Sequence, residues 1–217
     1  MHCILIDNPV SGKDRRRRRE QVLDVSRLLI ALGHRVETIQ TVAPGSATAQ
    51  ARDAAAGGAD VIFACGGDGT VHEVIQGLVS ESGLPDSVLG VIPLGSANAL
   101  ARHLCLSLDP KSAVLQQIHG TVHTIPIGKV VVGDRIRYFA VMAGAGPDGA
   151  LTYDALGAGK SRLGRLAYYL DAARIFLTHR FPAFEIEYTE AVFPPSASSC
   201  GSRPAPETAQ SARWKTT

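Results

Sequence analysis

Apolar residues along the first half of the chain follow two alternating periods, which predict alternating strands and helices. Residues 3–6 and 61–65 are short apolar runs, as expected of buried strands, and residues 35–40 alternate as a half-buried strand does. Between them, apolar residues recur at helical spacing over 22–32, and an alanine-rich helix is expected over 47–56, each followed by glycine. This βαβαβ order predicts a mostly parallel sheet with helices on both faces.

Two further elements extend the same pattern. Residues 88–92 are a fourth buried apolar run. Asp109 and Pro110 are a favoured N-cap and first residue for a helix through Ile118, and Ser46 has the right side chain to cap the helix over 47–56.

The pattern changes near residue 120, where alternating residues begin to predict antiparallel strands with a hairpin at Gly133-Asp134. We therefore expect an α/β, doubly wound nucleotide-binding domain over residues 1–120, followed by the start of an antiparallel β-rich domain over 121–192. Residues 193–217 are rich in Pro, Ser and Ala without periodicity, which predicts a disordered tail.

A glycine-rich turn, G-G-D-G-T at residues 66–70, joins the apolar run 61–65 to a helical repeat. Glycines allow phosphate oxygens to approach backbone N–H groups without meeting a Cβ, and the following helix N-terminus favours anions. The turn is a candidate phosphate-binding site, although it lacks the lysine of a P-loop and the spacing of the dinucleotide fingerprint.

Asp68 is the candidate for chemistry within this turn. A carboxylate at the end of a parallel strand, beside phosphates, can hold Mg²⁺ or orient an attacking hydroxyl. The structural alternative is a helix cap, but Thr70 and Glu73 already fit a capping box for the same helix. We therefore favour the functional interpretation of Asp68.

Three motifs resemble the diacylglycerol kinase catalytic domain family, which includes bacterial lipid kinases and sphingosine kinases. G-G-D-G-T followed by V-H-E-V-I-Q-G-L is similar to its nucleotide-binding motif, and N-P-V-S-G-K at 8–13 and P-L-G-S-A-N-A-L-A-R at 93–102 resemble its flanking motifs. Residues 143–148 and 160–170 look like the start of its second domain. G-G-D-G-T alone also resembles NAD kinases.

The resemblance implies an ATP-dependent lipid kinase that transfers the γ-phosphoryl group to a lipid hydroxyl, such as that of diacylglycerol, with ATP and Mg²⁺ bound. It implies that Asp68 serves catalysis and the metal. The nucleotide-binding residues that it implies are Asn8, Ser11, Gly12, Thr41, Gly66, Gly67, Asp68, Gly69, Thr70, Ser96 and Asn98. Ala99 departs from the Asp of many members, which puts an acidic role at this position in doubt.

Complete members of the family continue with further strands and a D-G-E-like segment that carries a proposed catalytic Asp, which this sequence lacks. We therefore expect a truncated chain with impaired activity. Two alternatives stay open at this point: an NAD kinase-like enzyme, and a nucleotide-binding remnant without catalysis.

Composition and charge limit the kinds of partner and the location that the sequence indicates. A net charge of +2 is too small to indicate a nucleic-acid partner, and no apolar run approaches the ~18 residues of a transmembrane helix. We expect a cytoplasmic protein, peripheral on the inner membrane face where its lipid substrate lies, and a homodimer is left open. Arg15 to Arg19 could meet anionic lipids there or form a solvated basic turn. The four cysteines lack metal-site spacing and are expected to be packing thiols.

Overall fold

The computed structural model of the 217-residue chain describes residues 1–11, 14–79, 86–143 and 210–216. The helices in this part of the chain are α1 (Arg15–Ala31), α2 (Ser46–Ala56), α3 (Asp68–Leu78), α4 (Ala99–His103) and α5 (Pro110–His119). The strands there are β1 (His2–Asp7), β2 (Arg35–Gln40), β3 (Val61–Gly66), β4 (Val88–Pro93), β5 (Thr121–Val132), β6 (Arg135–Phe139) and β7 (Gln210–Thr216). The predicted βαβαβ order is confirmed.

These elements belong to one compact unit that comprises Met1–Val141 and Thr189–Thr217. A second unit, Met142–Tyr188, lies almost entirely outside the described residues. The domain boundary expected near residue 120 stays a prediction, because the residues that would build a domain after β6 are outside that part. β7 falls inside the segment 193–217, for which the composition predicts disorder.

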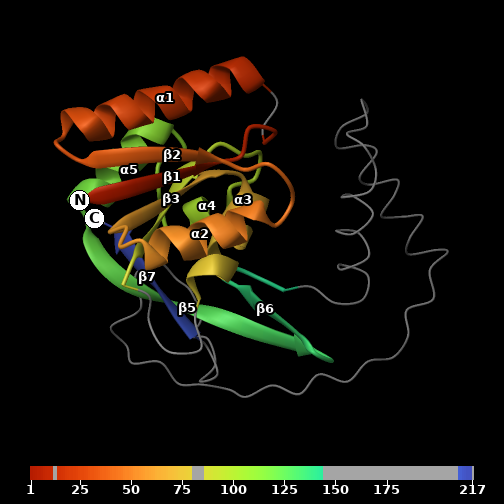
Figure 1. Ribbon diagram of the computed structural model, residues 1–217. Helices are drawn as coiled ribbons and strands as arrows, with labels where there is room; N and C mark the ends of the chain where they lie inside the picture. The colour runs from red at the N-terminus through yellow and green to blue at the C-terminus, as the bar shows by residue number, and fades with distance from the viewer. Residues whose placement is uncertain (12–13, 80–85, 144–209, 217) are drawn as a thin grey trace. The chain divides into compact units, whose positions relative to one another are not determined.

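The strands form one sheet in the order β2-β1-β3-β4-β7-β5-β6 (Figure 1). β2, β1, β3 and β4 pair in parallel, whereas β5 is antiparallel to both β7 and β6. The predicted hairpin is present, and its Gly133 has a φ of 56°, a backbone conformation that glycine adopts without strain.

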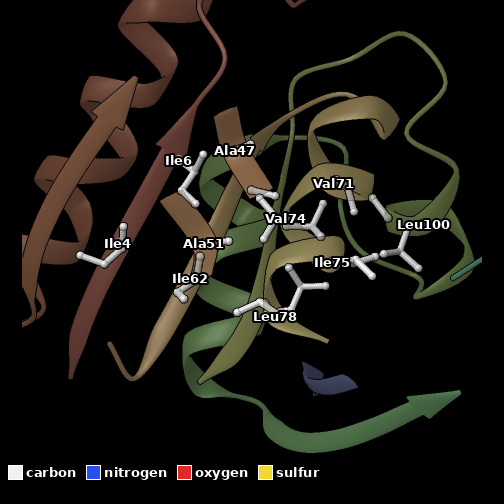
Figure 2. Close-up of a cluster of buried hydrophobic side chains, with 14 of the residues drawn as sticks. Ile4, Ile6, Ala47, Ala51, Ile62, Val71, Val74, Ile75, Leu78 and Leu100 are labelled. Carbon is white, nitrogen blue, oxygen red and sulfur yellow. The ribbon is translucent and has the colours of Figure 1, made fainter. Parts of the chain in front are cut away.

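Helices cover both faces of the parallel strands because successive side chains of a strand point to opposite faces. Cys3 and Leu5 of β1 pack in a cluster with residues of α1 and α5. Ile4 and Ile6 point to the other face, where Figure 2 shows them among side chains of α2 and α3. The predicted doubly wound α/β architecture is therefore confirmed.

The start of α5 is as predicted. Asp109 accepts a hydrogen bond from the Ser112 backbone N–H at 2.9 Å, and Pro110 is the first helical residue. The Ser112 backbone bond also lowers the pKa of Asp109, because it stabilises the ionised carboxylate.

The predicted cap of α2 is wrong. Ser46 is the first residue of the helix, and its N-cap is Gly45, with a φ of 86° and no side-chain bond. The backbone N–H of Ala47 donates instead to the carboxylate of Glu73 in α3, at 3.2 Å. A tertiary contact between two helices has taken the place of a local cap.

Candidate functional site

The four parallel strands end side by side at one edge of the sheet. Asp7 lies opposite both Gln40 and Cys65, and Gly66 lies opposite Pro93. The loops that follow β1, β2, β3 and β4 therefore start at the same edge (Figure 1). The chain leaves β1 toward the α1 face and β3 toward the α3 face, which is the switch point where open α/β sheets bind ligands.

Asn8 connects the loop after β1 to the turn after β3. Its side-chain Nδ2 donates to Thr70 Oγ1 at 3.0 Å, and its backbone N–H donates to the Cys65 carbonyl at 3.2 Å. Its Oδ1 accepts from the Val10 backbone N–H at 3.1 Å, which fixes the loop's first turn. Two of the predicted site residues, 62 positions apart, are thus in direct contact.

The glycine turn after β3 packs closely against the turn after β4. A Cβ on Gly67 would lie 3.2 Å from Gly95 Cα, and a Cβ on Gly66 would overlap the Thr70 side chain. Gly67 has a φ of −93°, so close packing and not a left-handed backbone favours glycine there. Gly69 differs, because a Cβ there would meet nothing within 4 Å among the described residues.

Asp68 is the first residue of α3 and is exposed. Its Oδ1 accepts a hydrogen bond from the Ala99 backbone N–H at 2.6 Å, which fastens the glycine turn to the start of α4. Position 99 therefore contributes its backbone, which any residue except proline supplies. The second carboxylate oxygen of Asp68 has no recorded partner in the described part of the chain.

The capping box expected for α3 is wrong. Its N-cap is Gly67 and forms no side-chain bond, while Thr70 lies inside the helix and accepts from Asn8. Glu73 caps α2 as described above. Asp68 also makes no cap for α3, because its carboxylate bonds to the neighbouring helix.

The loop between β4 and α4 is closed by Asn98. Its Oδ1 accepts from the Gly95 N–H and its Nδ2 donates to the Gly95 carbonyl, both at 2.9 Å. Asn98 is 8% exposed and has a φ of 50°, which asparagine tolerates better than most residues. The hydroxyl-bearing Ser96 is exposed on this loop.

The remaining predicted residues lie around the same edge. Thr41 donates its backbone N–H to the Asp7 carbonyl at 2.8 Å and is half-buried. Ser11 has a buried Oγ without a hydrogen-bond partner in the described residues. Gly12 lies outside the described residues, as do Asp148 and the basic segment around Lys160.

Arg18 was missed by sequence reasoning. It was grouped with the surface arginines of the run 15–19, but it is 4% exposed and pairs with the equally buried Asp7. Its Nη2 also donates to the Cys65 carbonyl at 2.9 Å. The signal was its helical phase, because the buried residues of α1 are Arg18, Val22, Val25 and Leu29.

Few groups at this edge could hold a metal. No cluster of three His, Cys, Asp or Glu side chains occurs in the described ranges. Burial raises the pKa of the Cys65 thiol well above its usual value, so it stays protonated. The Asp7 carboxylate is buried and paired with Arg18. The exposed carboxylate that could bind a metal at the glycine turn is that of Asp68. Mg²⁺ bound by one carboxylate together with substrate phosphates would fit this set.

The described residues contain no helix with the length and apolar character needed to cross a membrane.

A family model, the diacylglycerol kinase catalytic domain, matches residues 2–130. A diacylglycerol kinase of Bacillus subtilis strain 168 is 36% identical over 193 residues, which cover 87% of this chain and 60% of that protein. A diacylglycerol kinase of Staphylococcus saprophyticus is 33% identical, over 87% of this chain and 59% of that protein. The chain thus spans about 60% of the length of these relatives.

A crystal structure of a diacylglycerol kinase from Bacillus anthracis strain Sterne has a similar fold. It superimposes with a TM-score of 0.56 at 24% identity, covering 80% of this chain and 54% of that one.

Proposed function

Because this chain belongs to the diacylglycerol kinase catalytic domain family, we propose that it binds Mg-ATP at the carboxyl edge of its parallel strands and phosphorylates a lipid hydroxyl, such as that of diacylglycerol. The proposal rests on one observation: hydrogen bonds join the loops that contain the three sequence motifs. Asn8 joins the first to the second through Thr70, and Asp68 joins the second to the third through Ala99. The family match does not favour an NAD kinase.

The glycine turn supplies the phosphate-binding part. The first N–H groups of a helix have no acceptor within the helix. In α3, the N–H groups of Thr70 and Val71 both donate to the Gly67 carbonyl, and those of Asp68 and Gly69 have no acceptor among the described residues, which leaves them for a ligand. The absence of a Cβ at Gly69 keeps this approach open, and the hydroxyls of Ser11, Thr41 and Ser96 would bond the nucleotide.

Asp68 is the residue that would engage Mg²⁺, directly or through water. One of its oxygens is held by Ala99, so the carboxylate is oriented before a ligand arrives. Mg²⁺ held there would supply neutralisation of phosphate charge. In the transfer, the lipid oxygen bonds to the γ-phosphorus, the bond from that phosphorus to the leaving ADP breaks, and the hydroxyl proton is released to solvent. The protein's part in such a transfer is mainly positioning and charge neutralisation.

The test of the proposed function is a competition between acceptors. The purified chain is incubated with γ-labelled ATP, Mg²⁺, NAD and mixed micelles of diacylglycerol. Label in the lipid supports the proposal, and label in NAD contradicts it. Mg-ATP binding without label in either acceptor would favour a nucleotide-binding module that does not catalyse transfer.

Gly69→Ala is expected to weaken Mg-ATP binding about tenfold or more without a loss of stability, since a methyl group there would meet no described protein atom within 4 Å but would obstruct the proposed phosphate approach. Calorimetric titration and urea unfolding are the measurements. Gly67→Ala serves as the contrast, because its methyl would press on Gly95 and should lower stability as well as affinity. Unchanged affinity in Gly69→Ala would remove the phosphate-binding role of this turn.

The exposed arginines at the start of α1 offer a surface for anionic lipids at the same edge of the sheet. Arg15, Arg16, Arg17 and Arg19 are exposed, and α1 begins directly after the loop that contains Asn8. Replacing these four by Gln is expected to weaken cosedimentation with anionic vesicles about tenfold, because basic residues near such a surface contribute about 1 kcal/mol each before screening. Arg18 is left intact because it is buried.

A variant with the same charge loss elsewhere is the control for this experiment; it replaces Arg27, Arg35, Arg52 and Lys111. Vesicle binding that falls equally in both variants would reflect net charge alone and contradict a docking role for the start of α1.

A further inference from the structure

One buried guanidinium ties the ends of neighbouring strands at the candidate nucleotide edge. Arg18, the fourth residue of α1, pairs with the Asp7 carboxylate at the end of β1 and donates to the Cys65 carbonyl near the end of β3. The second Asp7 oxygen accepts a long bond of 3.4 Å from Gln40 Nε2, at the end of β2. Three strands that lie side by side thus meet at one ion pair.

The two residues bonded to Arg18, Asp7 and Cys65, each directly precede residues of the candidate site in the sequence. The Cys65 carbonyl that accepts from Arg18 also accepts from the Asn8 backbone N–H, and Asn8 in turn holds Thr70. The Asp7 carbonyl accepts from the Thr41 backbone N–H. Displacement of this ion pair would therefore move the loops after β1, β2 and β3 together.

Stability alone is a weak reason for such a pair. Removing a carboxylate and a guanidinium from water is costly, and apolar residues of similar volume are often at least as stabilising. The Nε of Arg18 is also buried without a partner in the described residues, so the arrangement is not optimised for folding. An ion pair at the edge of a site, with directional bonds to neighbouring strand ends, is better suited to fixing geometry.

We propose that Asp7 and Arg18 are positioning residues, which hold Asn8 and the turn at residues 66–70 in the arrangement that binds nucleotide phosphates. The inference rests on the proposed function for its use of the site, but the geometric part concerns only the loops. Neither side chain is placed in contact with substrate.

The experiment replaces the pair by apolar residues, Asp7→Leu with Arg18→Met, and compares it with the wild type and with Arg27→Met, an exposed arginine of the same helix. In this variant the Cys65 carbonyl loses its bond from Arg18 but keeps the one from the Asn8 backbone N–H, so it is not left unsatisfied. We expect an unfolding midpoint close to that of the wild type. Native-state amide exchange of Asn8 and Thr70, whose N–H groups donate to the Cys65 and Gly67 carbonyls, should become about tenfold faster, because their local opening becomes easier, with no change in the centres of β1 and β3.

Calorimetric titration with Mg-ATP is the second readout, and about tenfold weaker binding is expected from loosely held phosphate-binding groups. If the double variant does not fold, Arg18→Lys keeps the charge but not the planar guanidinium, and the same changes in exchange and affinity are expected. Wild-type exchange at Asn8 and Thr70 in the folded variant overturns the inference. A wild type that binds no Mg-ATP contradicts the proposed function instead, and the exchange experiment still decides whether the pair positions the loops.

Discussion

Asp68→Asn is expected to lower phosphoryl transfer by about 10²–10³-fold while leaving the fold and its stability unchanged. The amide oxygen of Asn can still accept the hydrogen bond from the Ala99 N–H, so the contact between the glycine turn and α4 is retained. The negative charge that would hold Mg²⁺ or its waters is lost. Initial rates with labelled ATP and diacylglycerol micelles, at several Mg²⁺ concentrations, measure the effect.

Asp68→Ala separates the two roles of this side chain. It removes both the charge and the bond to Ala99, so it should reduce the rate to a similar extent and also lower stability by about 1 kcal/mol. Asp53→Asn, which alters a carboxylate on α2, is the control for a general effect of charge. A rate for Asp68→Asn within about twofold of wild type would assign Asp68 to structure alone.

The sequence predicted the α/β part well because its signals are local. The runs at β1, β3 and β4 are apolar throughout, and all six residues of β3 and of β4 are buried between helices. A strand covered on both faces has no polar alternation, which is why these short runs could be identified. The Asp109-Pro110 start of α5 depends on neighbours in sequence and was also predicted correctly.

The capping predictions for α2 and α3 were wrong because they assumed partners close in the sequence. Thr70 and Glu73 have the spacing of a capping box, and Ser46 precedes an alanine-rich helix. In the folded chain, Glu73 reaches the amide of Ala47 in the neighbouring helix, and Thr70 bonds to Asn8. Once α2 and α3 pack together, a tertiary partner replaces the one expected from spacing.

The site residues remain a prediction, and the sequence did not indicate the hydrogen bonds that join their loops. The motif resemblance named Asn8, Thr70 and Asn98, and the structure brings their loops to one edge of the sheet. The hydrogen bond between Asp68 and Ala99 spans 31 positions and uses the backbone N–H of Ala99. Its donor therefore does not depend on the residue type at position 99, and the sequence could not predict the bond. Arg18 was misjudged because a run of charge obscured its helical phase.

Gln117 of α5 is the residue whose replacement should lower stability most among the variants considered. It is 2% exposed, and its side chain makes both hydrogen bonds of a strand neighbour to Val91 in β4. Its Oε1 accepts from the Val91 N–H at 2.7 Å, and its Nε2 donates to the Val91 carbonyl at 2.8 Å. Among the described residues, β4 pairs with β7 at one position, Leu89, and the Gln117 amide bonds to this strand at Val91.

Gln117→Leu is expected to lower the free energy of unfolding by about 2–5 kcal/mol, because two backbone groups of Val91 lose their partners in a buried setting. Leu has a similar volume and a good helix propensity, so neither a large cavity nor a weakened α5 confuses the result. Urea unfolding followed by circular dichroism measures it. Gln50→Leu is the matched control, since it removes a bond to the exposed Gln40 carbonyl, which water can replace, and should cost less than about 1 kcal/mol. Equal losses in the two variants would mean that the strand-like pairing of Gln117 adds nothing beyond an ordinary surface hydrogen bond.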